Sequence, residues 1–354
     1  MNAVVPDPEN PFVRNPFFFA NVTSQSFADT PFAFAHRLNN IALAAVGIPL
    51  AALLFFLILR KAPTHLKPYS RILLVCTMAD LLVVATDIFC QARVRITSGM
   101  LLVSFRGPAS LLSYEHQRWA MSFQSMVAII GVAILPAEYF IRLQIIQSHT
   151  PDLHQTVGYF CFPLIFVVFV GITGYFGYFP LDERDYGRHW YQEQPIPTLV
   201  VGHTQNPVYI VHVLSCGIVM CASDAVAMYL GRKSVSQLAK KSSEWSQRTR
   251  LLHKQLAWQL LLQSISPLFS VVPILIAVVF LIAGEGRGNL GDYVLGTIGW
   301  CPVTTMLGTL WCIKPFRKYC ADRLGCCRKN TRVVHSSGVA VVDAAPQRSA
   351  STRT

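Results

Sequence analysis

The sequence predicts an all-α, polytopic membrane protein built as a bundle of seven transmembrane helices. Of its 354 residues, 53% are hydrophobic and only 14% are charged, whereas charged residues make up about a quarter of an ordinary soluble domain. The mean hydropathy is positive, at +0.42. Seven stretches are apolar over the roughly 20 residues that a helix needs to cross the hydrocarbon core of a bilayer. These observations indicate that lipid surrounds most of the folded chain.

Short segments rich in charged residues and turn formers separate the seven predicted spans. Gly107-Pro108 and Gly284-Glu285-Gly286 are examples, and such residues end helices. We expect residues 1–38 to form an N-terminal tail, residues 39–319 a single membrane domain, and residues 320–354 a polar, disordered tail. The predicted spans run approximately over residues 40–59, 72–91, 119–141, 157–179, 207–230, 255–283 and 293–313.

The distribution of basic residues predicts a multi-pass protein with its N-terminus outside the cell. In that orientation 21 of the 30 Lys and Arg residues fall on the cytoplasmic side, in agreement with the positive-inside rule. The same sidedness accounts for the net charge of +12, so we do not expect nucleic acid as a partner. The exception is the first external loop, with Arg93, Arg95, Arg106 and Arg118. Asn21 begins a glycosylation sequon, which fits an external tail.

Two carboxylates in the second span are candidates for function, because ionisable groups are costly in lipid. Asp80 and Asp87 are seven residues apart, so they lie on one face of the helix, which must point into the bundle. Asp80 is either a conformational switch, and a candidate cation site, or a neutral carboxyl that joins helices. Asp87 lies nearer the outer end, where it could meet a ligand; pairing with Arg93 or Arg95 is the favoured interpretation.

The inner ends of the third and fifth spans also carry charge. Glu138 and Arg142 are four residues apart, the spacing of an intrahelical ion pair. Such a pair is either an activation latch or an interfacial salt bridge of small energy. Asp224 lies toward the inner end of the fifth span, where Arg142 or His253 could donate hydrogen bonds to it.

Proline interrupts several of the predicted spans, at Pro136, Pro163, Pro267, Pro273 and Pro302. Proline removes a backbone donor and kinks a helix. Kinks at Pro267 and Pro273 would let the inner part of the sixth helix swing and open a cytoplasmic cleft. In a static bundle the same prolines would only shape the packing.

Catalytic and cofactor motifs are absent from the sequence. It contains no His-Glu-x-x-His, no Gly-x-Ser-x-Gly and no glycine-rich phosphate loop. We therefore predict that the protein is not an enzyme and holds no cofactor or metal ion. His212 is the one histidine deep within a span, where a hydrogen-bonded core residue is commoner than a metal ligand. Cys320, Cys326 and Cys327 follow the seventh span in a basic, interfacial segment and are candidates for palmitoylation.

Four stretches of the sequence resemble nematode serpentine chemoreceptors, and most closely those of class delta (Srd). The stretches are residues 67–71 leading into 79–82, Gly107-Pro108-Ala109, residues 255–273, and Trp300-Cys301-Pro302 running to Arg317. Their order and spacing cover nearly all of the chain from the first span to the end of the seventh. The chain departs from the related pattern at Ala109, where a cysteine is often found, and at the end of the third span, which reads Tyr139-Phe140-Ile141-Arg142.

This resemblance implies a chemosensory G-protein-coupled receptor of the plasma membrane, in sensory cilia. It implies that a small odorant or pheromone enters from the outer side and that a heterotrimeric G protein couples to the inner ends of the third, fifth and sixth helices. The candidate ligand-pocket residues are Asp87, Gln91, Gln124, His212 and Tyr293. The candidate conformational-switch residues are Asp80, Glu138, Arg142, Asp224, Pro267, Pro273, Trp300 and Pro302. The alternative is a seven-helix transporter or ligand-gated channel in which Asp80, Asp87 and Asp224 line a conducting path.

Overall fold

The computed structural model describes residues 31–61, 67–97, 100–147, 149, 151–181, 199–241, 258, 265, 268–283 and 290–323. The chain up to Arg317 forms one compact unit, and the chain from Lys318 onward forms a second. The Asn21 sequon, His253, Pro267, Cys326 and Cys327 fall outside the described residues.

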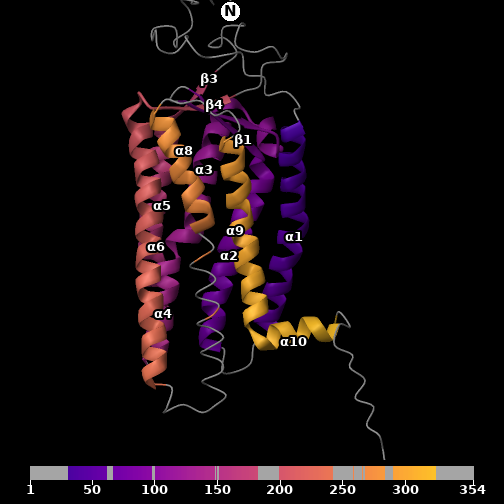
Figure 1. Ribbon diagram of the computed structural model, residues 1–354, viewed down its shortest axis with the longest axis vertical. Coiled ribbons are helices and arrows are strands. Elements are labelled where there is room, and N and C mark those ends of the chain that lie inside the picture. Colours follow the sequence, from indigo (N-terminus) through magenta and orange to yellow (C-terminus); the bar gives the residue numbers. More distant parts are fainter. Residues whose placement is uncertain are drawn as a thin grey trace, which may run out of the picture. The chain divides into compact units, whose positions relative to one another are not determined.

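Long helices packed side by side form the first unit (Figure 1). They are α1 (Pro31–Lys61), α2 (Lys67–Cys90), α3 (Tyr114–Ala133), α4 (Leu135–Ile146), α5 (Leu153–Gly177), α6 (Pro207–Lys241), α8 (Leu268–Ala283) and α9 (Leu290–Cys312), followed by α10 (Lys314–Arg323). Five described helical segments are long and apolar enough to cross a membrane: Phe34–Lys61, Tyr69–Cys90, Glu115–Ile146, His154–Gly177 and Pro207–Lys240. Val271–Ala283 is a shorter apolar helix. The predicted helical bundle is therefore confirmed, although α1 begins before the predicted span and α6 continues past its predicted end.

The exposed side chains of α5 are apolar, which indicates whether lipid or water surrounds this helix. Phe162, Ile165 and Phe169 are each about half exposed or more, whereas Val167 and Val170 on the opposite face are fully buried. A soluble protein rarely leaves so much contiguous apolar area in water. The exposed face of α5 is therefore suited to contact lipid.

The third predicted span is divided into α3 and α4 at Ile134. Pro136, at the start of α4, has no amide hydrogen to donate. The hydrogen-bond ladder nevertheless continues around it, because Ile134 N donates to Ile130 O and Glu138 N donates to Ile134 O, each at 3.1 Å. The interruption is confined to one turn, and the two helices remain joined.

A four-stranded antiparallel sheet lies at the end of the bundle where α1 begins (Figure 1). Its strands are β1 (Ala92–Thr97), β2 (Met100–Phe105), β3 (Tyr178–Leu181) and β4 (Leu199–His203), in the order β1-β2-β4-β3. The hairpin of β1 and β2 connects α2 to α3 through the short 3-10 helix η2 (Pro108–Leu111), while β3 and β4 flank the connection from α5 to α6. The sequence predicts loops here, apart from Tyr178 and Phe179 of β3, which fall at the end of the predicted fourth span. Sequence reasoning missed the sheet because strands of four to six residues, directly after apolar helices, show no periodicity of their own.

Candidate functional site

A cavity of about 220 Å³ lies inside the bundle. Side chains from α2, α3, α4, α6, α8 and α9 form its wall, and Val94, Ile96 and Leu101 of the sheet close its outer end. Most of the lining is aliphatic. The few polar groups are therefore the features that can orient a bound molecule.

The carboxylate of Asp87 and the side chain of Gln124 meet in the outer part of this cavity. The Gln124 amide nitrogen donates to Oδ1 of Asp87 at 3.0 Å, joining α2 to α3. The Oε1 atom of Gln124 is buried and has no hydrogen-bond partner among the described residues. A Cβ added at Gly299 would lie 2.5 Å from Oδ2 of Asp87, so α9 approaches this carboxylate as closely as it does because the residue there is glycine. The predicted pairing of Asp87 with Arg93 or Arg95 is wrong, because the carboxylate turns inward to Gln124.

His212 of α6 lines the same cavity and is held by backbone groups. Its Nδ1 lies 3.1 Å from the carbonyl oxygen of Val170 and 3.5 Å from the hydroxyl of Thr173. The ring packs edge-on against Tyr178 at a centroid distance of 5.3 Å. The prediction of a hydrogen-bonded core histidine is confirmed.

A buried acidic cluster lies at the inner part of the cavity. Glu138 is completely buried and forms an ion pair with Arg142, whose side chain is 2% exposed. The Cys76 thiol donates to Oε2 of Glu138 at 3.2 Å. Asp80 lines the cavity beside this cluster. The predicted ion pair is thus confirmed in geometry, and it is not an exposed interfacial salt bridge, because water is excluded from both groups.

Asp224 is buried on α6, which packs against α4, and neither of its carboxylate oxygens has a hydrogen-bond partner among the described residues. The Nε and Nη1 atoms of Arg142 are also buried without partners there. The predicted hydrogen bond from Arg142 to Asp224 is therefore wrong for this conformation. Buried polar groups are nearly always paired in a stable packing, so this pair of helices holds unused bonding capacity.

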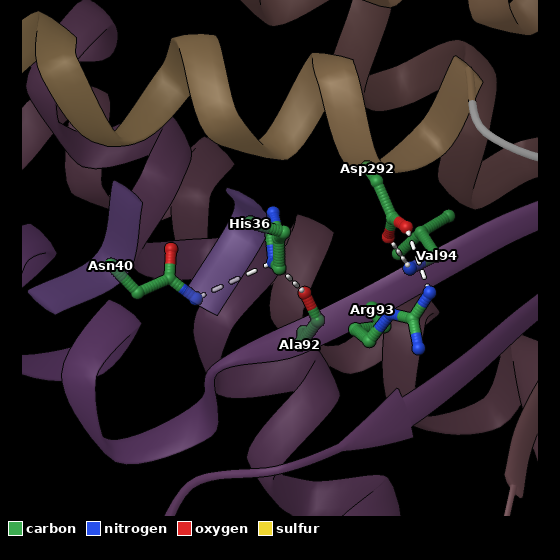
Figure 2. Close-up of polar contacts among 6 residues, drawn as sticks. All are labelled: His36, Asn40, Ala92, Arg93, Val94 and Asp292. Carbon is green, nitrogen blue, oxygen red and sulfur yellow. Dashed lines mark hydrogen bonds and ion pairs between the residues drawn. The ribbon is translucent and has the colours of Figure 1, made fainter. Parts of the chain in front are cut away.

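A second buried ion pair fixes the sheet to the bundle (Figure 2). Arg93 of β1 lies 3.5 Å from Oδ2 of Asp292 in α9, and both side chains are essentially unexposed. The other Asp292 oxygen accepts the Val94 amide hydrogen at 2.9 Å. His36 of α1 lies 3.2 Å from the Ala92 carbonyl oxygen and 3.4 Å from the Asn40 side chain. Strand β1 is thereby held to the first and last membrane helices at once.

Sequence reasoning missed Asp292 because it lies just before the predicted seventh span. Arg93 drew attention only as an exception to the charge rule. That exception was the available signal: Arg93 is a buried partner of a carboxylate and does not act as a charge on an external loop. Arg95 of β1 is buried as well, at only 6% exposed.

Two of the candidate ligand residues do not reach the cavity. Gln91 follows the last turn of α2 with a positive φ of 40°, where the chain turns into β1. Tyr293 is 61% exposed on the outer surface of α9. The Tyr293 side chain therefore points away from the cavity. Asp87, Gln124 and His212 all line it.

The remaining switch candidates lie on α8 and α9. Pro302 lines the cavity, and the Trp300 indole nitrogen donates to Oδ1 of Asn39 at 2.7 Å, joining α9 to α1. Pro273 lies within α8. In the second unit, burial raises the pKa of the half-buried Cys320 thiol above its usual range.

A family model supplies the deciding comparison. The model of the serpentine type 7TM GPCR chemoreceptor Srd matches residues 37–322. The chain belongs to this Srd family. The Srd chain is similar to serpentine receptor class delta-33 of Caenorhabditis elegans, with 23% identity over 317 residues, which is 85% of this chain and 89% of that protein.

The solved structure of squid rhodopsin supports the fold of the Srd chain. It superposes with a TM-score of 0.53, covering 90% of this chain and 92% of the rhodopsin chain, at 9% sequence identity. At that identity the likeness shows the fold alone. The seven-transmembrane receptor architecture, and the resemblance on which the sequence reading relied, are both confirmed.

Proposed function

We propose that this receptor binds a small odorant or pheromone from the outer side and signals through a heterotrimeric G protein. The observation that carries the proposal is the extent of the cavity. One continuous cavity is lined by residues from Val94 of the sheet to Glu138 of the inner cluster. A ligand in its outer part therefore shares a wall with the ion pair that we assign to the switch.

The signalling step would use the unused bonding capacity between α4 and α6. Arg142 is bonded to Glu138 through one nitrogen, while Asp224 on the neighbouring helix has two carboxylate oxygens without a hydrogen-bond partner among the described residues. A shift of α6, or of the α8 segment that contains Pro273, would exchange one set of partners for another. An element with two available packings is what a switch requires.

The proposed placement is the plasma membrane, the sensory cilium included, with the N-terminus outside. The excess of Lys and Arg in the third internal loop and in the C-terminal region supports it. Glycan at Asn21 and palmitate at Cys320, Cys326 or Cys327 are modifications that this placement would allow.

The test is a second-messenger assay in cells that express the receptor, with a panel of small volatile compounds. We expect Arg142→Ala and Pro267→Ala to weaken ligand-evoked signalling while the amount of receptor at the cell surface persists. Arg37→Ala, at an exposed position of α1, and Pro163→Ala, within α5, are the matched controls. Unchanged responses in both switch variants would contradict the proposal.

A transporter or ligand-gated channel is the second candidate, because Asp80 and Asp87 line the cavity without a cationic partner among the described residues. Asp224, the third residue expected along a conducting path, is not part of the lining. Ligand-evoked current in cells without a coupled G protein would favour the channel over the receptor.

A further inference from the structure

The charge of the cavity lining is one-sided. Its described residues include three carboxylates, Asp80, Asp87 and Glu138, and neither lysine nor arginine. Arg142, which is not a lining residue, neutralises the charge of Glu138. No described cation is bonded to Asp80 or Asp87. An uncompensated carboxylate in a low-dielectric interior is costly, and a bound cation removes that cost.

Asp87 and Gln124 also present matching acceptors. The Gln124 amide nitrogen is used on Oδ1 of Asp87, which leaves Oε1 of Gln124 without a donor and Oδ2 of Asp87 without a hydrogen bond in the described part of the chain. Both groups lie on the cavity wall. Two neighbouring acceptors with no donor between them suit a group that carries several N–H bonds.

We propose that the cavity binds a small organic cation, a primary ammonium group on a short apolar body, with the ammonium held by Asp87 and Gln124. This inference rests on the proposed function, since it names the ligand class of the same site. The apolar body would lie against Val294, Ile298 and Leu281, which line the cavity beside the sheet. At about 220 Å³ the space is smaller than the roughly 300–1,000 Å³ of typical ligand pockets, so the ligand is small.

A metal ion fits these residues less well than an amine. The described residues contain no group of three His, Cys, Asp or Glu side chains that could hold a metal. Asp80 and Asp87 are two turns apart, about 10 Å along the helix axis, so one ion cannot bridge them. An ammonium group needs only the Asp87 carboxylate and one further acceptor.

The experiment uses the purified full-length receptor and matched sets of probes that share a carbon skeleton: butylamine, butanol and butyric acid, then benzylamine, benzyl alcohol and benzoic acid. Binding is measured as the ligand-induced rise in unfolding temperature and as an affinity from titration. We expect the amines to bind and the acids not to bind. Asp87→Asn should weaken amine affinity about 30-fold or more, the lower end of what breaking a buried charged contact costs. Gln124→Leu should weaken it less.

Glu115→Gln is the control, because it removes an exposed carboxylate of α3 that is not part of the lining. Its amine affinity should equal that of the wild type. If the acids or alcohols bind as well as the amines, if no amine binds, or if Asp87→Asn binds amines normally, the inference is overturned. A rise in unfolding temperature with sodium chloride alone, lost in Asp87→Asn and not accompanied by amine binding, would also overturn it in favour of an inorganic ion.

The outcomes separate this inference from the proposed function. Signalling evoked by acids or alcohols would retain the receptor function and exclude the organic cation. Amine binding without any second-messenger response in cells would retain the cation site and exclude G-protein signalling.

Discussion

The two buried ion pairs lie at opposite ends of the bundle, and they differ in how far apart in the sequence their partners are. Arg93 and Asp292 are 199 residues apart and connect β1 to α9. Glu138 and Arg142 are four residues apart within α4. The outer pair therefore joins two distant elements, whereas the inner pair lies within one helix and does not itself bridge α4 to α6. The comparison teaches that an ion pair between distant residues ties the outer end together, whereas the inner ion pair stays within α4.

The largest expected effect is at the outer end. Asp292→Ala removes the partner of the buried Arg93 and the acceptor of the Val94 amide, which should cost about 3–5 kcal/mol of stability. The unfolding temperature of the detergent-purified receptor and the amount reaching the cell surface should both fall. Glu115→Ala is the control, because its carboxylate is 57% exposed in a surface pair with Arg118 and should change stability by less than about 1 kcal/mol. Equal behaviour of the two variants would remove the distinction between the ends.

A smaller effect is expected at the inner end. Glu138→Gln removes the counter-charge of Arg142 but keeps an amide oxygen that can accept its hydrogen bond, so the expected cost is smaller, about 1–3 kcal/mol. The double variant Glu138→Gln with Arg142→Met should regain most of that loss, because neither charge is then buried. Thermal unfolding of the three proteins measures the difference. Failure of the double variant to recover would mean that the pair stabilises the fold through its other contacts, such as the hydrogen bond from Cys76 of α2 to Glu138.

Asp224→Asn should change stability by no more than about 1 kcal/mol, and in the stabilising direction, because it removes an unpaired buried charge. Its effect should appear in signalling, since the acceptors for Arg142 are altered. The measurement is the ligand-evoked second-messenger response at matched surface expression. A large loss of stability would show that Asp224 is already paired in the resting receptor.

The smallest expected effect is the pH dependence of stability that His203 gives to the sheet. Burial lowers the pKa of His203 in β4, and its Nδ1 accepts the Gln205 amide hydrogen at 2.8 Å. The unfolded chain therefore binds this proton more readily, so the contribution of His203 is complete above the ordinary histidine pKa of about 6.5 and is lost as the pH falls below it. Unfolding temperatures of wild type and His203→Gln, compared across this range, should converge in acid. Parallel curves would show that the proton binds elsewhere.

Local spacing was enough to predict much of this molecule. Composition and apolar length gave the helices, and the four-residue spacing of Glu138 and Arg142 gave their ion pair. Asp80 and Asp87 were placed on an inward face of α2 by helical periodicity, and both line the cavity.

The side-chain contacts that sequence reasoning missed join distant parts of the chain. The partner of Asp87 is Gln124 on another helix, and the partner of Arg93 is Asp292 near the far end. Spacing along the sequence carries no information about such contacts. Tyr293 was expected in the ligand pocket and lies outside the cavity lining for a related reason. The position of a residue along a span does not determine which way the helix is rotated about its axis.

The two hydrogen bonds that bridge Ile134 join α3 and α4 into one helical segment. Gln124 lies ten residues before Ile134, about 15 Å along the axis, and Arg142 lies eight residues after it, about 12 Å. Gln124 of the cavity and Arg142 of the inner ion pair therefore lie on the same helical segment, about 27 Å apart along its axis. The proposed ligand contact and the proposed switch are therefore connected by a single stretch of helix that contains Pro136.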